Sequence, residues 1–201
     1  MEENKTEKQT SEEEEVLEQE ASAGRKQLKS EIISWIKVVV FAVLLAFVLA
    51  NFVFMNAYIP SGSMKNTLNE KDRVMGFRLS YMFSEPKRFD VIMFKWPDDE
   101  SKDFIKRIIG LPGETVTLKN GKVYIDGSDV PLDEPYLRET PNGMGDGVYQ
   151  VPDHCYFVLG DNRNYSKDSR LWEHKYVNED KILAKAIFRF YPKFTMIKTD
   201  Y

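Results

Sequence analysis

A short turn with two hydroxyl groups is the first stretch of this sequence whose side chains suit a chemical reaction. It reads Ser61-Gly62-Ser63 and follows Pro60, which fixes φ and biases Ile59 toward an extended backbone. Gly62 permits a turn that a Cβ would hinder. A serine held on such a turn can present its Oγ as a nucleophile, with nearby donors for an oxyanion. The same three residues also suit an ordinary polar loop.

A serine nucleophile needs a general base, and the sequence offers a lysine for this role. Neither His154 nor His174 has a triad setting, whereas Lys106 lies inside the apolar run 104–109. Burial among apolar groups disfavours the ammonium form and lowers the pKa of a lysine. A neutral amine can then take the proton of Ser63. The competing interpretation is a lysine whose stem covers the strand while its ammonium stays in water.

A polar loop after the apolar segment 155–159 supplies the third group of candidate residues. Residues 160–170 read Gly-Asp-Asn-Arg-Asn-Tyr-Ser-Lys-Asp-Ser-Arg, and such stretches are commonly solvated turns. Its closing Asp-Ser-Arg also suits an ion pair that supports an active site.

Residues 31–55 predict a transmembrane helix ahead of these candidates. The stretch 38–64 carries no charge and is long enough to cross a hydrocarbon core of ~30 Å. Basic residues precede the run, so the positive-inside rule places residues 1–30 in the cytoplasm and residues 56–201 outside. A cleaved signal peptide is the alternative, but the run begins late and lacks a small-x-small exit. The charged residues 1–30 predict a disordered tail.

Residues 56–201 predict mainly β structure, because short apolar segments follow one another without a sustained helical period. The expected strands are 73–77, 90–95, 104–109, 115–118, 123–125, 155–159 and 185–191. Asn120-Gly121 predicts a type I′ hairpin turn, and the glycine-rich stretch 143–147 predicts a mobile surface loop. Together these features favour an antiparallel β-sheet sandwich or barrel.

Composition excludes several classes of function. The net charge of −4 and the lack of a basic block argue against a nucleic-acid partner. A single cysteine, Cys155, excludes an intramolecular disulfide framework. The two histidines have no Cys or His companion at ligand spacing, so we expect neither a metal nor a cofactor.

Taken together, the motifs resemble those of type I signal peptidases of the bacterial plasma membrane, in the short, single-anchor form of Gram-positive bacteria. The resemblance covers roughly residues 30–195. The matching blocks are 60–64 with Thr67-Leu68, then 72–74, 88–91 leading to 105–107 and 110–113, and 160–163 with Ser166, Asp168, Ser169 and Arg170.

This resemblance implies a Ser–Lys dyad, with Ser63 as nucleophile and Lys106 as general base. It implies that Ser166 hydrogen-bonds the Lys106 amine. The oxyanion would then be met by the Ser63 backbone N–H and the Ser61 hydroxyl.

The same resemblance implies a structural scaffold around the dyad. Asp168 and Arg170 would form an ion pair that keeps the Ser166 loop in place. Asp161 and Arg163 would belong to the same scaffold.

The implied substrates are preproteins that carry signal peptides, with the lipid bilayer and the secretion translocon as further partners. The preprotein would lie extended between the strands that lead to Ser63 and carry Lys106. Shallow apolar pockets would accept small side chains and give an Ala-x-Ala preference. The residues we expect there are Ile59, Pro60, Met64, Leu68 and Ile105.

Three positions depart from the family pattern. Asn66 stands where proline is usual, Phe104 where tyrosine is frequent, and Asn164 where aspartate is frequent.

Two other functions remain as alternatives. The first alternative is a non-catalytic, membrane-anchored assembly factor or chaperone built on the same sheet. The second is a self-cleaving repressor, which the apolar anchor and the acidic charge disfavour.

Overall fold

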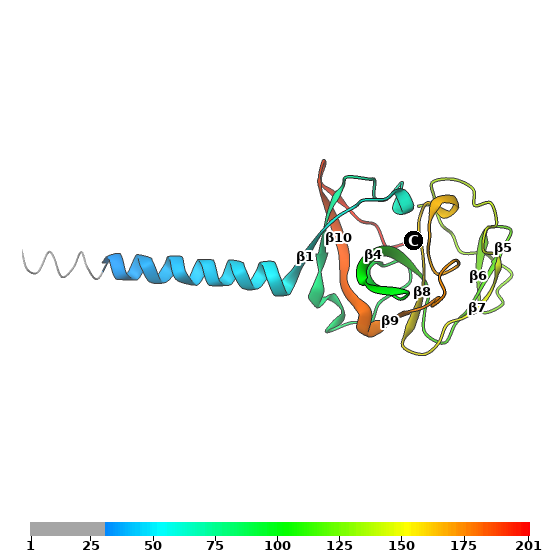
Figure 1. Ribbon diagram of the computed structural model, residues 1–201, viewed down its shortest axis with the longest axis horizontal. Helices are drawn as coiled ribbons and strands as arrows, with labels where there is room; N and C mark the ends of the chain where they lie inside the picture. The colour runs from blue at the N-terminus through cyan, green and yellow to red at the C-terminus, as the bar shows by residue number, and fades with distance from the viewer. Residues whose placement is uncertain (1–30) are drawn as a thin grey trace, which may run out of the picture. The chain divides into compact units, whose positions relative to one another are not determined.

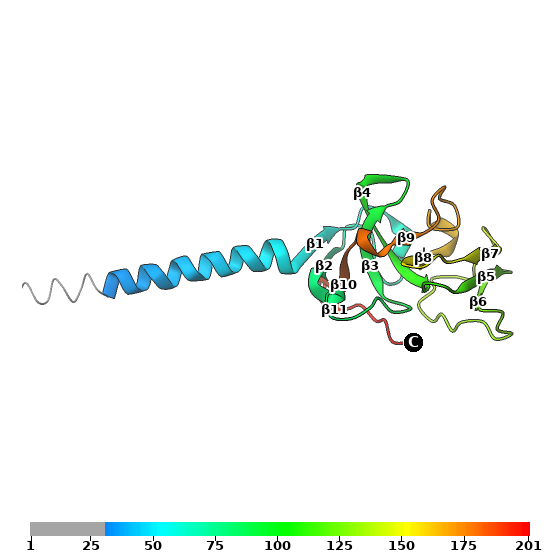
Figure 2. The ribbon, with the colours of Figure 1, turned by 90° about the horizontal axis from the view of Figure 1, so that it is seen from below.

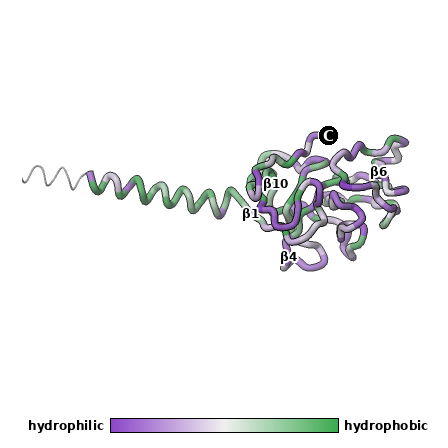
Figure 3. The backbone as a smooth tube through the Cα atoms, turned by 90° about the horizontal axis from the view of Figure 1, so that it is seen from above, coloured by the Kyte–Doolittle hydropathy of each residue, from purple (hydrophilic) through white to green (hydrophobic). Residues whose placement is uncertain are grey.

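The computed structural model describes residues 31–201, so the predicted charged tail lies outside the described residues. A helix runs from Glu31 to Val53, and it is long and apolar enough to cross a membrane (Figure 3). Its last turn, Leu49–Val53, is a π-helix (η1), and the first strand begins at Phe54. The helix therefore ends two residues before the predicted boundary. Residues from Ala50 onward form a separate compact unit.

This unit is built from antiparallel strands, as predicted, and after Val53 its only helices are short 3-10 turns (Figure 1). The strands are β1 (Phe54–Tyr58), β2 (Arg73–Phe77), β3 (Val91–Trp96), β4 (Asp99–Gly110), β5 (Thr115–Lys119), β6 (Lys122–Ile125), β7 (Gly147–Gln150), β8 (Cys155–Leu159), β9 (Val177–Asn178), β10 (Ile182–Tyr191) and β11 (Thr195–Met196). The turns are η2 (Gly62–Met64), η3 (Arg78–Tyr81), η4 (Arg163–Tyr165) and η5 (Glu179–Lys181).

Eight strands form the larger sheet in the order β1-β2-β10-β3-β4-β8-β9, with β11 paired to β10. Strand β4 has two different halves. Residues 99–103 are mostly exposed in the hairpin with β3, whereas residues 106–110 are buried between β3 and β8. Successive side chains of a strand point to opposite faces, so Lys106 and Arg107 lie on the two faces of β4, and both are buried.

The smaller sheet has the order β6-β5-β7, and its three strands lie together in both ribbon views (Figures 1 and 2). The predicted hairpin turn between β5 and β6 is confirmed, since Asn120 and Gly121 have φ values of 51° and 74°. Positive φ at both central residues is the property of a type I′ turn.

Three apolar clusters fill the unit on the two sides of β4. One packs the smaller sheet against β8, and its centre includes Val116 and Phe157. A second lies under η2 and includes Met64 and Leu68. The third contains Trp172, which is 1% exposed. The turn at residues 61–63 carries the predicted nucleophile and is called the nucleophile turn below; it packs on the cluster of Met64 and Leu68. Lys106 lies in a buried part of β4 and not on a loop.

As predicted, residues 143–146 of the glycine-rich stretch form a loop, and its mobility stays a prediction. The Arg170 guanidinium donates to the Met144 carbonyl at 3.0 Å, and the Tyr149 hydroxyl donates to the Gly145 carbonyl at 2.7 Å. Strand β7 starts at Gly147 and pairs with β5. Sequence reasoning missed this strand because glycines precede it and only four residues form it.

Candidate active site

The nucleophile turn is held between two strands of the larger sheet. The backbone N–H of Ile59 donates to Asp72 at 3.0 Å, which extends the pairing of β1 beyond Tyr58. The chain then turns through η2, where Ser63 is 7% exposed. Gly62 does not adopt a positive φ; a Cβ there would instead lie 2.9 Å from the Glu70 carboxylate. Because Glu70 is an exposed, flexible side chain that can move aside, neither backbone strain nor close packing requires glycine at this position.

The two residues of the predicted dyad lie in direct contact. The Lys106 Nζ donates to the Ser63 Oγ at 2.8 Å and to the Ile105 carbonyl at 3.0 Å. Lys106 is 4% exposed, and its ammonium lies 5.3 Å from the centroid of the Phe104 ring. The interpretation of Lys106 as a surface lysine is therefore wrong.

The environment of Lys106 makes it a stronger candidate for a base. Burial lowers its pKa from 10.5 to about 8, and the Asp168 and Asp161 carboxylates oppose part of this shift. Burial dominates because, among residues 31–201, no carboxylate is in direct contact with the amine to hold its charge. A pKa near 8 leaves a useful fraction of neutral amine at physiological pH.

A second hydroxyl of the site belongs to Ser61, which is exposed beside Ser63. Its Oγ lies 3.5 Å from the Ser63 Oγ. The Ser61 hydroxyl and the Ser63 backbone N–H therefore lie on the same turn, within reach of an atom bonded to the Ser63 Oγ.

Ser166 lies at the site without forming its predicted bond to Lys106. Its Oγ is buried and has no hydrogen-bond partner among the described residues. It is nevertheless close, because a Cβ placed on Gly160 would meet both the Ser166 Oγ, at 2.2 Å, and the Ser63 carbonyl oxygen, at 2.5 Å. The expected Ser166–Lys106 hydrogen bond is thus absent, and the Ser166 hydroxyl packs against Gly160 instead.

Gly160 and Asn162 are two positions that sequence reasoning did not select. The Asn162 side-chain amide donates to the Gly62 carbonyl at 2.8 Å, and its backbone N–H donates to the Ser63 carbonyl at 3.0 Å. The residues after β8 therefore hold the nucleophile turn through its backbone. Only their position directly after a buried strand could have signalled this role.

Replacing Gly160 by alanine is expected to lower the kcat/KM of the reaction at Ser63 by roughly 10²-fold, because the new Cβ must displace the Ser63 turn by about an ångström. The control is Gly147→Ala, where the nearest atoms lie at 3.6 Å and φ is not positive. Steady-state kinetics on both variants compare the two effects. Wild-type kcat/KM in Gly160→Ala would contradict this account of the turn.

A buried ion pair lies on the opposite face of β4. Arg107 Nε and Nη2 donate to the two carboxylate oxygens of Asp161 at 2.9 and 2.7 Å, and both side chains are fully buried. The carbonyls of Phe89 and Lys198 accept from Nη1 at 2.8 and 3.0 Å. Thr67 Oγ1 accepts from Nη2 at 3.2 Å, so every guanidinium N–H has an acceptor. Asp161 is placed in the scaffold as expected, whereas its partner Arg107 was not selected from the sequence.

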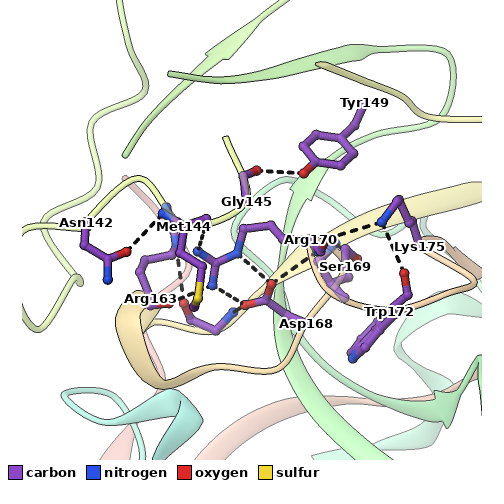
Figure 4. Close-up of polar contacts among 12 residues, drawn as sticks. Asn142, Met144, Gly145, Tyr149, Arg163, Asp168, Ser169, Arg170, Trp172 and Lys175 are labelled. Carbon is purple, nitrogen blue, oxygen red and sulfur yellow. Dashed lines mark hydrogen bonds and ion pairs between the residues drawn. The ribbon is translucent and has the colours of Figure 1, made fainter. Parts of the chain in front are cut away.

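The other scaffold residues form two further buried pairs. Arg170 Nε and Nη2 donate to the Asp168 carboxylate at 2.8 and 2.9 Å, so the predicted ion pair is present (Figure 4). Asp168 also accepts from the backbone N–H of Gly160 at 3.0 Å, which links the pair to the nucleophile turn. Arg163 pairs with Glu134, a partner that lies in the linking region before β7.

The five residues expected to contact the substrate lie around this turn at different depths. Ile59, Met64 and Leu68 are at most 2% exposed and belong to the apolar cluster under η2. Ile105 is partly buried against the same cluster, and Pro60 is exposed. Their role in substrate binding stays a prediction. Because Ile59, Met64 and Leu68 are buried, they could contact a substrate only at the floor of a pocket.

Two of the departures from the family pattern have structural roles. Asn66 adopts a φ of 92° and donates its side-chain amide to the Tyr136 carbonyl at 2.9 Å. A proline could not adopt that φ. Asn164 Oδ1 accepts from the backbone N–H of Asn142 at 2.8 Å. Within residues 31–201, no three His, Cys, Asp or Glu side chains gather in a group that could hold a metal.

Comparison with known proteins identifies the family. The family model for signal peptidase, peptidase S26, matches residues 32–191. The chain belongs to this family of signal peptidases. Signal peptidase I of Leptolyngbya laminosa is 40% identical over 179 residues, which cover 85% of each chain. Signal peptidase I S of Bacillus subtilis (strain 168) is 37% identical over 182 residues, which cover 86% of this chain and 96% of the relative.

A crystal structure of a signal peptidase I from Enterococcus faecalis V583 is 36% identical in sequence. It covers 51% of this chain and 97% of its own, with a TM-score of 0.44. The curated relatives support signal peptidase I activity for this chain, and the apolar helix fits a single-pass membrane protein.

Proposed function

We propose that this signal peptidase cleaves preproteins by a Ser–Lys dyad made of Ser63 and Lys106. The observation that carries the proposal is the 2.8 Å contact between the Lys106 Nζ and the Ser63 Oγ, together with the burial of the lysine. The neutral amine takes the Ser63 proton as the Oγ attacks the scissile carbonyl.

The resulting ammonium then returns its proton to the leaving amine, which is the new N-terminus of the mature protein. The Ser63 N–H and the Ser61 hydroxyl stabilise the negative oxygen of the tetrahedral intermediate. Hydrolysis of the acyl-enzyme repeats the sequence with water as nucleophile, and Lys106 again serves as the base.

The geometry also supports a preference for small residues before the cut. An extended substrate lies beside the turn of Ser63 and the end of β4, where its main chain bonds to the enzyme without reading side chains. The apolar residues under η2 are packed too tightly to admit a large side chain. We therefore assign an Ala-x-Ala preference to this site.

We assign the N-terminus to the cytoplasm and the β unit to the outer face of the plasma membrane. Lys37 lies near the start of the apolar helix, further basic residues precede the helix in the sequence, and no basic residue follows Lys37 until Lys65. Such an asymmetry orients single helices with their basic end inside. In this orientation the active site meets preproteins as the secretion translocon delivers them.

The pH dependence of preprotein cleavage tests the proposal. Because the neutral amine is the active form, kcat/KM should rise as Lys106 loses its proton, with a midpoint near its pKa of about 8. The measurement is kcat/KM for one preprotein between about pH 6 and 10, with the folded state checked at each end. A flat profile across neutral and alkaline pH would rule out Lys106 as the base.

A further inference from the structure

Two aromatic rings extend from the reacting amine toward the exposed hairpin of β3 and β4. Lys106 Nζ lies 5.3 Å from the Phe104 ring centroid, and Trp96 stacks on Phe104 at 5.0 Å with an interplanar angle of 5°. The ammonium of Lys167 lies 4.9 Å from the Trp96 ring. Lys167 is exposed, so this row of side chains leads from the buried base to a charge in solvent.

The charge on Lys167 differs from the others around this hairpin. The four carboxylates of residues 98–103 each have a cationic or histidine partner: Asp98 with His174, Asp99 with Lys102, Glu100 with Lys181 and Asp103 with Lys95. Lys167 has no carboxylate partner within the part of the chain that the structure describes. It is therefore a cation that remains available to a ligand.

Lys167 is placed relative to the cleaved bond through Lys106, so this argument rests on the proposed function of Lys106 as the base. The ammonium of Lys106 must reach the leaving amine, which belongs to the first residue after the cut. An extended peptide advances about 3.3 Å per residue. The three contacts that link Lys106 to Lys167, of 5.3, 5.0 and 4.9 Å, therefore span at most roughly four further residues of an extended peptide.

The backbone that carries Lys167 also belongs to this site. Lys167 directly follows Ser166, and the Ser166 Oγ packs at Gly160 beside the Ser63 carbonyl. We therefore expect a substrate that continues from Ser63 toward Lys106 to run near this loop and the Trp96 ring.

We propose that Lys167 and Trp96 form a subsite for an acidic side chain in the mature part of the preprotein, two to four residues after the cut. The Lys167 ammonium pairs with the carboxylate of the substrate, and the Trp96 ring under that ammonium keeps the lysine in place. Because the charge is exposed, its contribution is modest and depends on salt.

The test uses the full chain in detergent and preproteins that differ at one position. Aspartate and lysine are placed in turn at the second, third and fourth residue after the cut, and kcat/KM is measured for each pair. We expect the aspartate substrate to be preferred by roughly two- to fivefold at one of these positions, at low ionic strength. The preference should shrink as salt is added.

Lys167→Glu should reverse this preference, whereas the control Lys119→Glu should leave it unchanged. Lys119 is an exposed lysine of β5, so its replacement changes the net charge by the same amount at a different place. An aspartate-to-lysine ratio that is equal in wild type and Lys167→Glu would overturn the subsite. Failure of the wild type to cleave any of the substrates would instead contradict the Ser63–Lys106 assignment.

Discussion

Replacing Lys106 by methionine is expected to lower kcat for preprotein cleavage by roughly 10⁴- to 10⁶-fold. Methionine is unbranched and close to the lysine stem in shape, so it fills the same buried space without an amine. The Ser63 hydroxyl then keeps its place but loses the only base within 2.8 Å among the described residues. Single-turnover cleavage at about pH 9 is the sensitive measurement, because the wild type is then mostly in its active form.

The matched control is Lys102→Met, the same substitution on the exposed half of β4. Lys102 pairs with Asp99 at 2.6 Å on the surface, so its loss should leave kcat nearly unchanged. Unfolding followed by tryptophan fluorescence separates a loss of catalysis from a loss of folding. If Lys106→Met folds and retains a tenth of the wild-type kcat or more, the dyad assignment is wrong.

Asp161→Asn is expected to destabilise the β unit by roughly 3–5 kcal/mol, because Arg107 would become a buried charge without a counter-charge. Burial by itself lowers the pKa of the Arg107 guanidinium, but hydrogen bonds and charge from Asp161 outweigh it and raise that pKa. Asp161→Asn removes these contributions and leaves burial acting against the charge, but the intrinsically high pKa of arginine keeps the guanidinium protonated. Denaturant unfolding of the full chain in detergent measures the change.

Asp129→Asn is the control for this prediction, since it removes a carboxylate from an exposed loop. The double variant Arg107→Met with Asp161→Asn removes the unpaired charge, and we expect it to recover part of the lost stability. Equal unfolding free energies for Asp161→Asn and Asp129→Asn would contradict the structural role of the pair.

Much of the fold could be predicted from local signals. The apolar helix, the Asn120-Gly121 hairpin and most strands depend on neighbouring residues, and the structure agrees with them within a few positions. The short strands β9 and β11 were missed because each has only two residues, too few to show an alternation of apolar and polar side chains. Strand β4 was predicted too short because its first half is charged and exposed.

The candidate site was predicted less completely, because its residues meet through long-range pairing. Lys106 and Ser63 are 43 residues apart, and only the order of the strands brings them to 2.8 Å. The resemblance to signal peptidases supplied that pairing in advance. It did not supply Gly160 or Asn162, whose roles depend on close backbone approach to the nucleophile turn.

The Arg107–Asp161 pair shows a second limit of sequence reasoning. An arginine beside the candidate base reads as a surface charge, and nothing local indicates that the distant Lys198 carbonyl completes its hydrogen bonds. The predicted hydrogen bond between Ser166 and Lys106 is also absent. Ser166 lies close to the Ser63 turn, but its hydroxyl packs against Gly160, and a sequence does not indicate how a hydroxyl is oriented.

Cleavage of a full-length preprotein by the detergent-purified chain, beside the Ser63→Ala variant, tests the central claim most directly. The N-terminus of the product is sequenced to locate the cut. The account predicts that the parent cuts after an Ala-x-Ala site and that Ser63→Ala, equally folded, does not. Absence of cutting by the folded parent with lipid supplied, or equal cutting by Ser63→Ala, would contradict it.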